Sequence, residues 1–320
     1  MKKNKIKDTG LEVTELSFGT SSLGSMPDTY GYEVPEQRAQ ETLKRFFQGP
    51  VNMLDTSRNY AMGESEKRIG IAIKENGGWP ENFVLSTKID RNMDTLVLDK
   101  IRTRESIEES LKTLNVDSVD ILFLHDPEYV KDVNDITKKD GALDELFKIK
   151  EEGLAKAVGL AMGKINIMFP LLKNWDFDVI INHNRYTLLN READEMYSYA
   201  HSKNISIFNA APYAGGVLAK GPSNFKKITY QDVTEEKLAP AREIEKVCKK
   251  YNVEMGAAAL QFSMKDKRIT STLCGVTSVQ SIEKNLSWAQ TSIPDKFWNE
   301  LLKLPFSTKD PESERIFTPG

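Results

Sequence analysis

The stretch NMLDTSRNYAMGESEKRIG, residues 52–70, holds the three parts of one structural unit in order. It opens on an apolar run that ends at Leu54, continues through a short polar loop, and closes on Gly-Glu-Ser-Glu, which is typical of a helix start. An apolar run without polar alternation indicates a strand that is buried on both faces. We therefore interpret the stretch as a strand, a loop and a helix.

The same unit recurs along the chain. Comparable strand-like runs occupy residues 15–18, 51–54, 83–88, 119–125, 155–161, 178–182, 205–210 and 269–276. Segments between them carry apolar residues at helical spacing, namely Ile107, Leu111 and Leu114; Leu143, Leu146 and Phe147; Ala193, Met196, Tyr197 and Ala200; and Ala241, Ile244, Cys248 and Tyr251. About eight alternations predict a single domain over residues 1–320, a closed (β/α)₈ TIM barrel. An open doubly wound sheet is the alternative, but no Gly-x-Gly-x-x-Gly follows the first strand.

Two further features concern the ends of the predicted barrel. Ahead of the first strand, Ile6, the turn Asp8-Thr9-Gly10, and then Leu11 and Val13 predict a β-hairpin that closes the bottom of the barrel. Three connections, at residues 20–35, 126–140 and 220–235, are long and polar. Long loops of this kind tend to be functional.

Composition narrows the class of protein. The 320 residues are 39% hydrophobic and 28% charged, with a net charge of −3 and mixed signs, so there is no basic stripe for nucleic acid. No apolar signal-peptide segment follows the N-terminal lysines, and no run of about 18 apolar residues occurs. We expect a soluble, cytoplasmic protein with a small-molecule partner. Cys248 and Cys274 lack metal-ligand spacing and are expected to be buried, reduced thiols.

Four titratable residues stand at the ends of predicted strands. Asp55 ends the second strand, Tyr60 lies on the loop after it, Lys88 ends the third strand and His125 ends the fourth. Each has an ordinary structural role open to it, as a helix cap, a packing residue, a solvated cation or a core histidine. In a barrel, however, the C-terminal strand ends build the active site, so all four side chains are expected to meet there.

The sequence resembles the aldo-keto reductase superfamily in the motifs LDTSRNYAMGESEKRIG, STKID and DILFLHDPE, and the resemblance extends from TGLEVTELSFGT to GVTSVQSIEKNL. The motifs LHDPE, INHNRYTLLN and NAAPYAGGVLAKG look like the branch of the aldose 1-dehydrogenases for D-threo-aldoses, L-fucose and L-galactose, with pyridoxal 4-dehydrogenase nearby. The resemblance implies a catalytic tetrad of Asp55, Tyr60, Lys88 and His125. Residue chemistry agrees: Lys88 would favour the Tyr60 phenolate, Asp55 would orient Lys88, and His125 would bind the substrate oxygen or relay its proton.

The resemblance also implies a nicotinamide cofactor near the C-terminus of the chain. Thr277 or Ser278 is predicted as the N-cap of a helix carrying Ile282 and Leu286, a helix start that can bind phosphate. Since Gly275, Ser278 and Ser281 stand where relatives that use a phosphorylated cofactor carry Lys or Arg, NAD is preferred, although Lys284 keeps NADP open. The full set of expected cofactor contacts is Gly19, Thr20, Asp55, His183, Pro212, Gly215, Gly216, Gly275, Thr277, Ser278, Ser281 and Asn285.

The predicted substrate is a small polar ring compound. Arg58, Tyr60, His125, Asp126 and Asn184 are its expected contacts. We expect oxidation of the lactol carbon of an aldose to a lactone, without a metal. Pyridoxal, which closes to a cyclic hemiacetal with the same reacting unit, and reduction of simple aldehydes or ketones are the alternatives, and a non-catalytic nicotinamide-binding subunit is a third. Ala161, Met162 and Ala210 replace the residues that hold the nicotinamide in many relatives, so the carboxamide contacts stay open.

Overall fold

The computed structural model describes residues 1–315 and contains a closed barrel of eight parallel strands. The strands follow one another around the barrel in chain order, and the last of them pairs with both the first and the seventh. They are β3 (Leu16–Gly19), β4 (Met53–Asp55), β5 (Val84–Ile89), β6 (Val119–His125), β7 (Ala155–Met162), β8 (Val179–His183), β9 (Ser206–Ala210) and β12 (Ser271–Gly275). The (β/α)₈ prediction is confirmed, and the open sheet is excluded because β12 closes onto β3.

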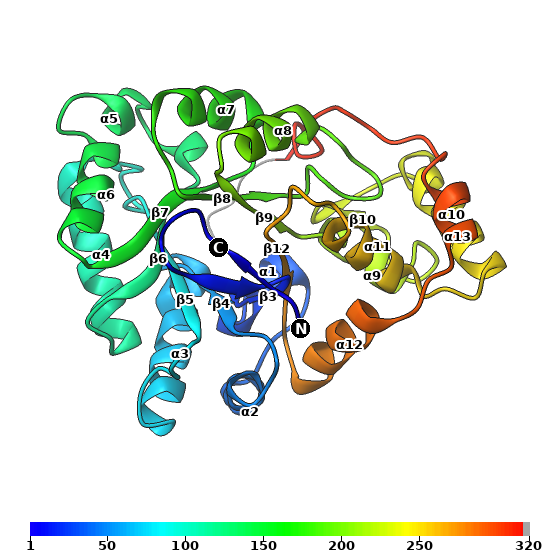
Figure 1. Ribbon diagram of the computed structural model, residues 1–320, viewed down its shortest axis with the longest axis horizontal. Coiled ribbons are helices and arrows are strands. Elements are labelled where there is room, and N and C mark those ends of the chain that lie inside the picture. The colour runs from blue at the N-terminus through cyan, green and yellow to red at the C-terminus, as the bar shows by residue number, and fades with distance from the viewer. Residues whose placement is uncertain (316–320) are drawn as a thin grey trace.

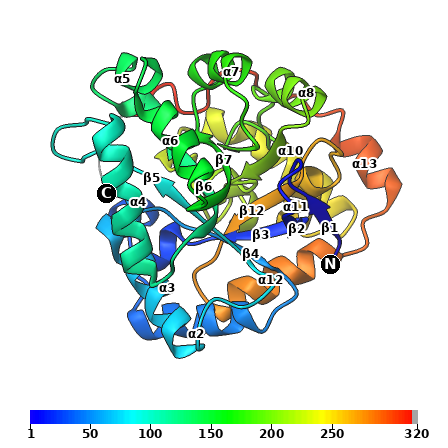
Figure 2. The ribbon, with the colours of Figure 1, turned by 60° about the vertical axis from the view of Figure 1, so that its left-hand side comes forward.

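Helices surround the barrel on its outside (Figure 1 and Figure 2). The longer ones are α2 (Glu36–Phe47), α3 (Glu64–Glu75), α4 (Lys100–Leu114), α6 (Ala142–Glu151), α7 (Ile165–Asn174), α8 (Asp194–Ser202), α10 (Glu235–Lys250), α11 (Met255–Met264), α12 (Val279–Gln290) and α13 (Asp295–Leu301). The four segments with predicted helical spacing fall on α4, α6, α8 and α10. Cys248 in α10 and Cys274 in β12 are buried free thiols, as expected.

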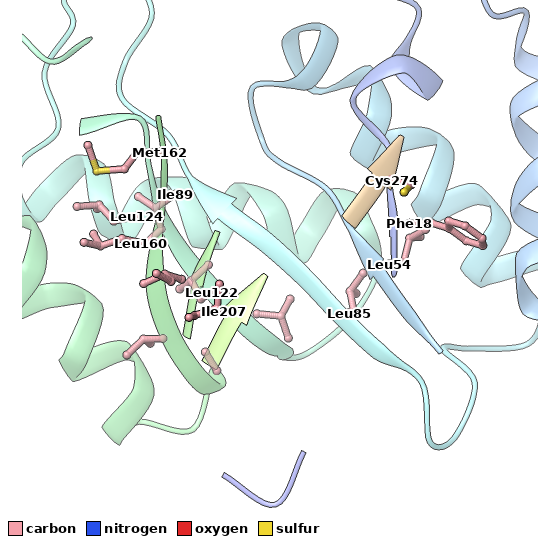
Figure 3. Close-up of a cluster of buried hydrophobic side chains, with 14 of the residues drawn as sticks. Phe18, Leu54, Leu85, Ile89, Leu122, Leu124, Leu160, Met162, Ile207 and Cys274 are labelled. Atoms are coloured by element: carbon pink, nitrogen blue, oxygen red, sulfur yellow. The ribbon is translucent and has the colours of Figure 1, made fainter. Parts of the chain in front are cut away.

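Alternating side chains of the strands supply two separate layers of core. Leu122 and Leu124 of β6 face the helices in the cluster drawn in Figure 3, beside Leu85, Leu160 and Ile207 of neighbouring strands. Ile121 and Phe123 belong instead to a cluster inside the barrel. Burial on both faces explains why the strands read as continuous apolar runs in the sequence.

The N-terminal hairpin of β1 (Lys3–Lys5) and β2 (Glu12–Thr14) closes one end of the barrel. Figure 1 shows it in dark blue across the strands. Its side chains Ile6, Leu11 and Val13 join the interior cluster with Met53 and Val84, the first residues of β4 and β5. The hairpin therefore seals the N-terminal end, as predicted, and leaves the C-terminal strand ends for a site.

The three long connections carry short elements that the sequence did not predict. Residues 20–35 hold a 3₁₀ turn, η1 (Ser21–Gly24), and α1 (Pro27–Tyr30); residues 126–140 hold the turn η3 (Pro127–Tyr129) and α5 (Asn134–Thr137). After β9 come the turn η4 (Ala214–Gly216), α9 (Val217–Lys220) and a two-stranded hairpin of β10 (Lys227–Ile228) and β11 (Gln231–Asp232). No helix within residues 1–315 is both long and apolar enough to cross a membrane.

A buried carboxyl group joins α3 to the barrel and makes stability depend on pH. Glu66 is fully buried, and its Oε1 accepts a hydrogen bond of 2.5 Å from Thr87 Oγ1 in β5. Burial raises the pKa of Glu66 to about 7, although hydrogen bonds from Thr87 and Ser110 oppose the shift. Between the ordinary pKa and pH 7, the native state keeps this proton while the unfolded chain has already released it. Ionisation of Glu66 therefore lowers the free energy of unfolding. The loss is complete above pH 7 and absent below the pKa of the unfolded chain.

We expect Glu66→Gln to remove this penalty while keeping a group that Thr87 can bond. The stability advantage of the variant over the wild type, measured as free energy of unfolding, should be about 3 kcal/mol larger at pH 8 than at pH 4.5. Each unit of pKa shift corresponds to about 1.4 kcal/mol. Urea unfolding at the two pH values measures the difference. An equal effect of the substitution at both would mean that Glu66 does not titrate between them.

Candidate active site

A cavity lies at the C-terminal end of the barrel. Six of its lining residues are the last residues of their strands: Gly19, Asp55, His125, His183, Ala210 and Gly275. Its volume is about 340 Å³, within the range of small-molecule sites. All three long connections contribute to its wall, with Tyr30, Tyr129 and Tyr230 among others. The loops predicted to be functional and the predicted tetrad therefore meet in one place.

Lys88 is the centre of the tetrad, and its ammonium group has three N–H donors. It donates to Asp55 Oδ2 at 2.7 Å, to the backbone oxygen of Thr56 at 2.5 Å and to Tyr60 Oη at 3.0 Å. The second Asp55 oxygen accepts from Ser86 Oγ at 2.6 Å, so the buried ion pair is fully bonded. Because Tyr60 Oη accepts from Lys88, the hydroxyl's own hydrogen is left to be donated into the cavity.

The loop that carries Tyr60 is held in an uncommon backbone conformation. Ala61 and Met62, within the 3₁₀ turn η2 (Tyr60–Gly63), have φ values of 51° and 53°. Such left-handed residues cost of order 1 kcal/mol or more each and persist only where the surroundings fix them. Here the backbone N–H of Asn59 is anchored on Asp90, and Ala61 packs against Gly24, where an added Cβ would lie 2.6 Å from the Ala61 Cβ.

The protonation state of Tyr60 differs from the sequence-based expectation. Burial raises the pKa of Tyr60 well above its ordinary value, and the negative charges of Asp55, Asp126 and Asp90 add to the rise. The expected phenolate is therefore not favoured at neutral pH, although the Lys88 ammonium, which also pairs with Asp55, lies 3.0 Å from the Tyr60 oxygen. In this state Tyr60 is a protonated phenol.

His125 has a buried acidic partner that sequence reasoning missed. Its Nδ1 lies 2.6 Å from Oδ1 of Asp90, the residue that follows β5. Burial lowers the pKa of His125, but the carboxylates of Asp90 and Asp126 outweigh burial, so the pKa is raised. A usable signal was present in the sequence, since Asp90 follows Lys88 by two residues and strand alternation places both side chains on one face.

Two predicted substrate contacts lie outside the cavity. Arg58 Nε pairs with Glu109 Oε2 of α4 at 3.0 Å, and the guanidinium packs under Gly63, so the side chain braces the Tyr60 loop. Asn184 is buried at the end of β8, where its amide is 3.5 Å from Glu312 Oε2. Tyr60, His125 and Asp126 do line the cavity. The structure therefore does not bring Arg58 and Asn184 to the cavity, and both side chains are bonded elsewhere.

Some of the predicted cofactor residues line the cavity and others do not. Gly19, Asp55, His183, Gly215, Gly216, Gly275 and Thr277 line the cavity, whereas Thr20, Pro212, Ser278, Ser281 and Asn285 stand behind its wall. The hydroxyl of Thr20 donates to the backbone oxygen of Asp55 at 2.9 Å. Pro212 is buried between two lining residues, Ala211 and Tyr213.

The start of α12 forms the predicted cap. Ser278 is the N-cap and forms a capping box with Ser281. The Ser281 hydroxyl also accepts hydrogen bonds from the backbone N–H groups of Thr277 and Ser278, at 2.9 and 3.0 Å. Asn285 bonds to Tyr213 and to the backbone of Ser281. A phosphate or adenine at this helix start would have to compete with these bonds.

Local packing explains why the APYAGG motif has glycine at positions 215 and 216. Gly215 has a φ of 74°, and a Cβ added to it would lie 2.7 Å from the backbone nitrogen of Tyr230. A Cβ on Gly216 would lie 3.3 Å from the Phe225 ring. Both glycines are therefore needed for packing of the loop that precedes β10 and of the β10–β11 turn. At Gly275, by contrast, nothing lies within 4 Å of an added Cβ, which leaves this part of the wall open.

The fold and the residues at the C-terminal end of the barrel agree with the comparison to known proteins. The aldo/keto reductase family model matches residues 15–304, and the chain belongs to this family. Members of the family use nicotinamide cofactors.

Among the relatives, L-galactose dehydrogenase of Arabidopsis thaliana is 30% identical over 292 residues, covering 88% of this chain and 85% of that protein. Pyridoxal 4-dehydrogenase of Microbacterium luteolum is 26% identical (93% and 96% covered), and D-threo-aldose 1-dehydrogenase of a Pseudomonas species is 27% identical (91% and 94% covered). An aldo-keto reductase structure from Bacillus halodurans, in its holo form, superposes with a TM-score of 0.80 at 21% identity, covering 99% of this chain and 100% of that one. This last similarity concerns the fold alone.

The Arg58 geometry yields a prediction. A loop-bracing, half-exposed ion pair contributes at most about 1 kcal/mol, so Arg58→Ala should lower kcat/KM by less than about fivefold, equally for sugars and for a small aldehyde. Glu109→Gln should reproduce the effect, because it removes the other half of the pair. A loss of 1.5 to 3 kcal/mol confined to one sugar, the size of a charge-assisted hydrogen bond, would restore Arg58 as a substrate contact.

Proposed function

We propose that the protein is an NAD(P)-dependent oxidoreductase that oxidises the lactol carbon of an aldose to a lactone, with Tyr60 as the acid/base. The observation that carries the proposal is the 3.0 Å contact of Lys88 Nζ with Tyr60 Oη at the cavity, beside His125. The three relatives described above support the substrate class, because two are named for aldoses or galactose and one for pyridoxal.

In this proposal the residues handle the proton at the substrate oxygen. A bound nicotinamide cofactor would accept the hydride in oxidation and supply it in reduction. In reduction Tyr60 Oη donates its proton to the carbonyl oxygen, and the Lys88 ammonium stabilises the phenolate that remains. In oxidation Tyr60 must first lose its own proton, and the phenolate then takes the hydroxyl proton of the substrate. His125 binds the same oxygen, and its imidazole lies edge-on to the Tyr60 ring with 5.7 Å between the ring centroids.

The wall of the cavity fits such a cofactor. Gly19 and Gly275 leave the ends of β3 and β12 without side chains, and Lys220 and Lys227 line the cavity as cationic partners for a pyrophosphate. His183 also lines the wall, with its Nδ1 3.3 Å from Glu312 Oε2, and would be available as a partner for the nicotinamide carboxamide. The two buried thiols accord with the cytoplasmic location that we also propose.

We expect NAD to be used at least as efficiently as NADP. Lys284, the basic residue on α12, is held 2.6 Å from Glu254, and it lies outside the cavity wall. A 2′-phosphate at the start of α12 would therefore meet serine hydroxyls and no free cation. The ratio of kcat/KM for the two cofactors, at one saturating sugar, measures the preference. A strong preference for NADP would contradict this assignment of α12.

The shape of the substrate follows from the aromatic residues of the cavity wall. Tyr30, Tyr32, Tyr129 and Tyr230 line it together with Asp126, and this combination suits a ring that presents both a flat face and hydroxyl groups. Pyridoxal in its hemiacetal form is the second candidate, because its aromatic ring can stack on the same tyrosines. A non-catalytic, nicotinamide-binding role is disfavoured by the fully bonded tetrad.

A cofactor-reduction screen tests the proposal. Purified protein is mixed with NAD or NADP and a panel of aldoses, pyridoxal and simple alcohols, and reduced-nicotinamide absorbance is followed. The proposal expects the highest kcat/KM for an aldose. Turnover of pyridoxal alone would select the second candidate, and cofactor binding without any turnover would select the non-catalytic role.

A further inference from the structure

The imidazole of His125 is fixed by the buried carboxylate of Asp90, which also anchors the loop that carries Tyr60. The registered pairing of β5 with β6 places Ile89 beside Leu124, so the next residues, Asp90 and His125, are neighbours. Asp90 is 1% exposed, and α4 anchors its backbone on both sides: its N–H donates to Ser106 Oγ at 3.0 Å, and its carbonyl oxygen accepts from Arg102 Nε at 3.1 Å. The strand end therefore has little freedom to move.

Both carboxylate oxygens of Asp90 are occupied on the side of the catalytic loop. Oδ1 lies 2.6 Å from His125 Nδ1, and Oδ2 accepts from Ser57 Oγ at 2.5 Å and from the Asn59 backbone N–H at 2.9 Å. A carboxylate accepts hydrogen bonds and does not donate them, so the hydrogen of the His125 contact must reside on Nδ1. The remaining nitrogen, Nε2, then faces the cavity that His125 lines.

We propose that Asp90 is a positioning residue that fixes the Nδ1–H form of His125, keeps the ring charged as an imidazolium, and so presents an Nε2–H donor to the substrate oxygen. The kinetic part of this inference rests on the proposed function. An imidazolium donor stabilises the negative charge that develops on the oxygen when the hydroxyl proton is removed in oxidation or when hydride arrives in reduction. Asp90 acts through His125 and does not itself contact the substrate.

The charged groups around His125 favour, on balance, the imidazolium form. Asp90, directly after β5, and Asp126, directly after β6 and with Oδ2 3.8 Å from His125 Nε2, both favour the charged ring. Lys88 on β5 opposes it, and the Tyr60 phenol is neutral. His125 in turn lowers the pKa of Asp90, against the raising effect of burial. Each partner therefore favours the charged form of the other, carboxylate and imidazolium.

Nuclear magnetic resonance tests the inference on the full-length protein without any substrate. The chain has three histidines, so the imidazole signal that disappears in His125→Gln identifies His125. In the wild type we expect its pKa to lie above the ordinary value of about 6.5, and its neutral form to carry hydrogen on Nδ1. A neutral form protonated on Nε2 would overturn the inference from the wild-type protein alone.

The variant Asp90→Asn adds a second readout. The pKa of His125 should fall by roughly one to three units, and the high-pH limb of kcat/KM for carbonyl reduction should move with it. Asp117→Asn, which alters an exposed carboxylate, should move neither. An unchanged His125 titration in folded Asp90→Asn would refute the role of Asp90. Since the titration needs no turnover, failure of the proposed substrate class would leave this test intact.

Discussion

Replacement of Tyr60 by phenylalanine is expected to lower kcat by about 10²- to 10⁴-fold, the usual contribution of a positioned general acid or base. The substitution removes the one hydroxyl that both accepts from Lys88 and faces the cavity, and it keeps the ring that packs against His125. Cofactor affinity should stay nearly unchanged, because the phenol is placed at the substrate oxygen. Steady-state kinetics and cofactor titration by fluorescence measure the two quantities.

A matched control separates this effect from the general loss of a tyrosine hydroxyl. Tyr251 Oη donates to Glu300 at 2.8 Å on the outside of the barrel, so Tyr251→Phe should leave kcat unaltered. Retention of more than a few per cent of wild-type kcat by Tyr60→Phe would remove Tyr60 from its proposed role.

Loss of Lys88 should affect folding as well as turnover. In Lys88→Met the buried Asp55 carboxylate loses its cationic partner, and breaking a buried pair in this way costs about 3 to 5 kcal/mol of unfolding free energy. The double variant Asp55→Asn with Lys88→Met removes both charges and should recover most of the stability. It should recover none of the activity, because the ammonium that supports Tyr60 is still absent.

Urea unfolding and steady-state kinetics of the two variants measure these effects. The contrast between recovered stability and absent turnover separates a catalytic role for the pair from a merely structural one. Turnover restored in the double variant would show that Lys88 serves only to neutralise Asp55.

The barrel was predictable because apolar runs and segments of helical spacing alternate along the sequence. Strands such as β6 are buried on both faces and therefore read as apolar runs, while α4 and α10 show helical spacing. The short elements of the loops were not predictable. The β10–β11 hairpin pairs only two residues per strand, and α1 is a single turn, so neither is long enough to leave a periodic pattern.

The tetrad was predictable from its places at strand ends, but its electrostatics were not. The sequence indicated a cation beside Tyr60, whereas the raised pKa of Tyr60 depends on burial and on how Asp55 shares the charge of Lys88. The position of Arg58 outside the cavity was not predictable for a related reason. Its partner Glu109 is 51 residues away on α4, and no local pattern reveals that the two side chains meet.

Isotope transfer tests the central claim most directly. The best aldose from the screen is prepared with deuterium at carbon 1, incubated with protein and oxidised cofactor, and both products are analysed by mass spectrometry and NMR. If the lactol carbon is the hydride donor, the deuterium appears in the reduced nicotinamide and the sugar is recovered as the lactone. Reduced cofactor without deuterium, or a sugar oxidised at another carbon, would contradict the assignment of this site to lactol oxidation.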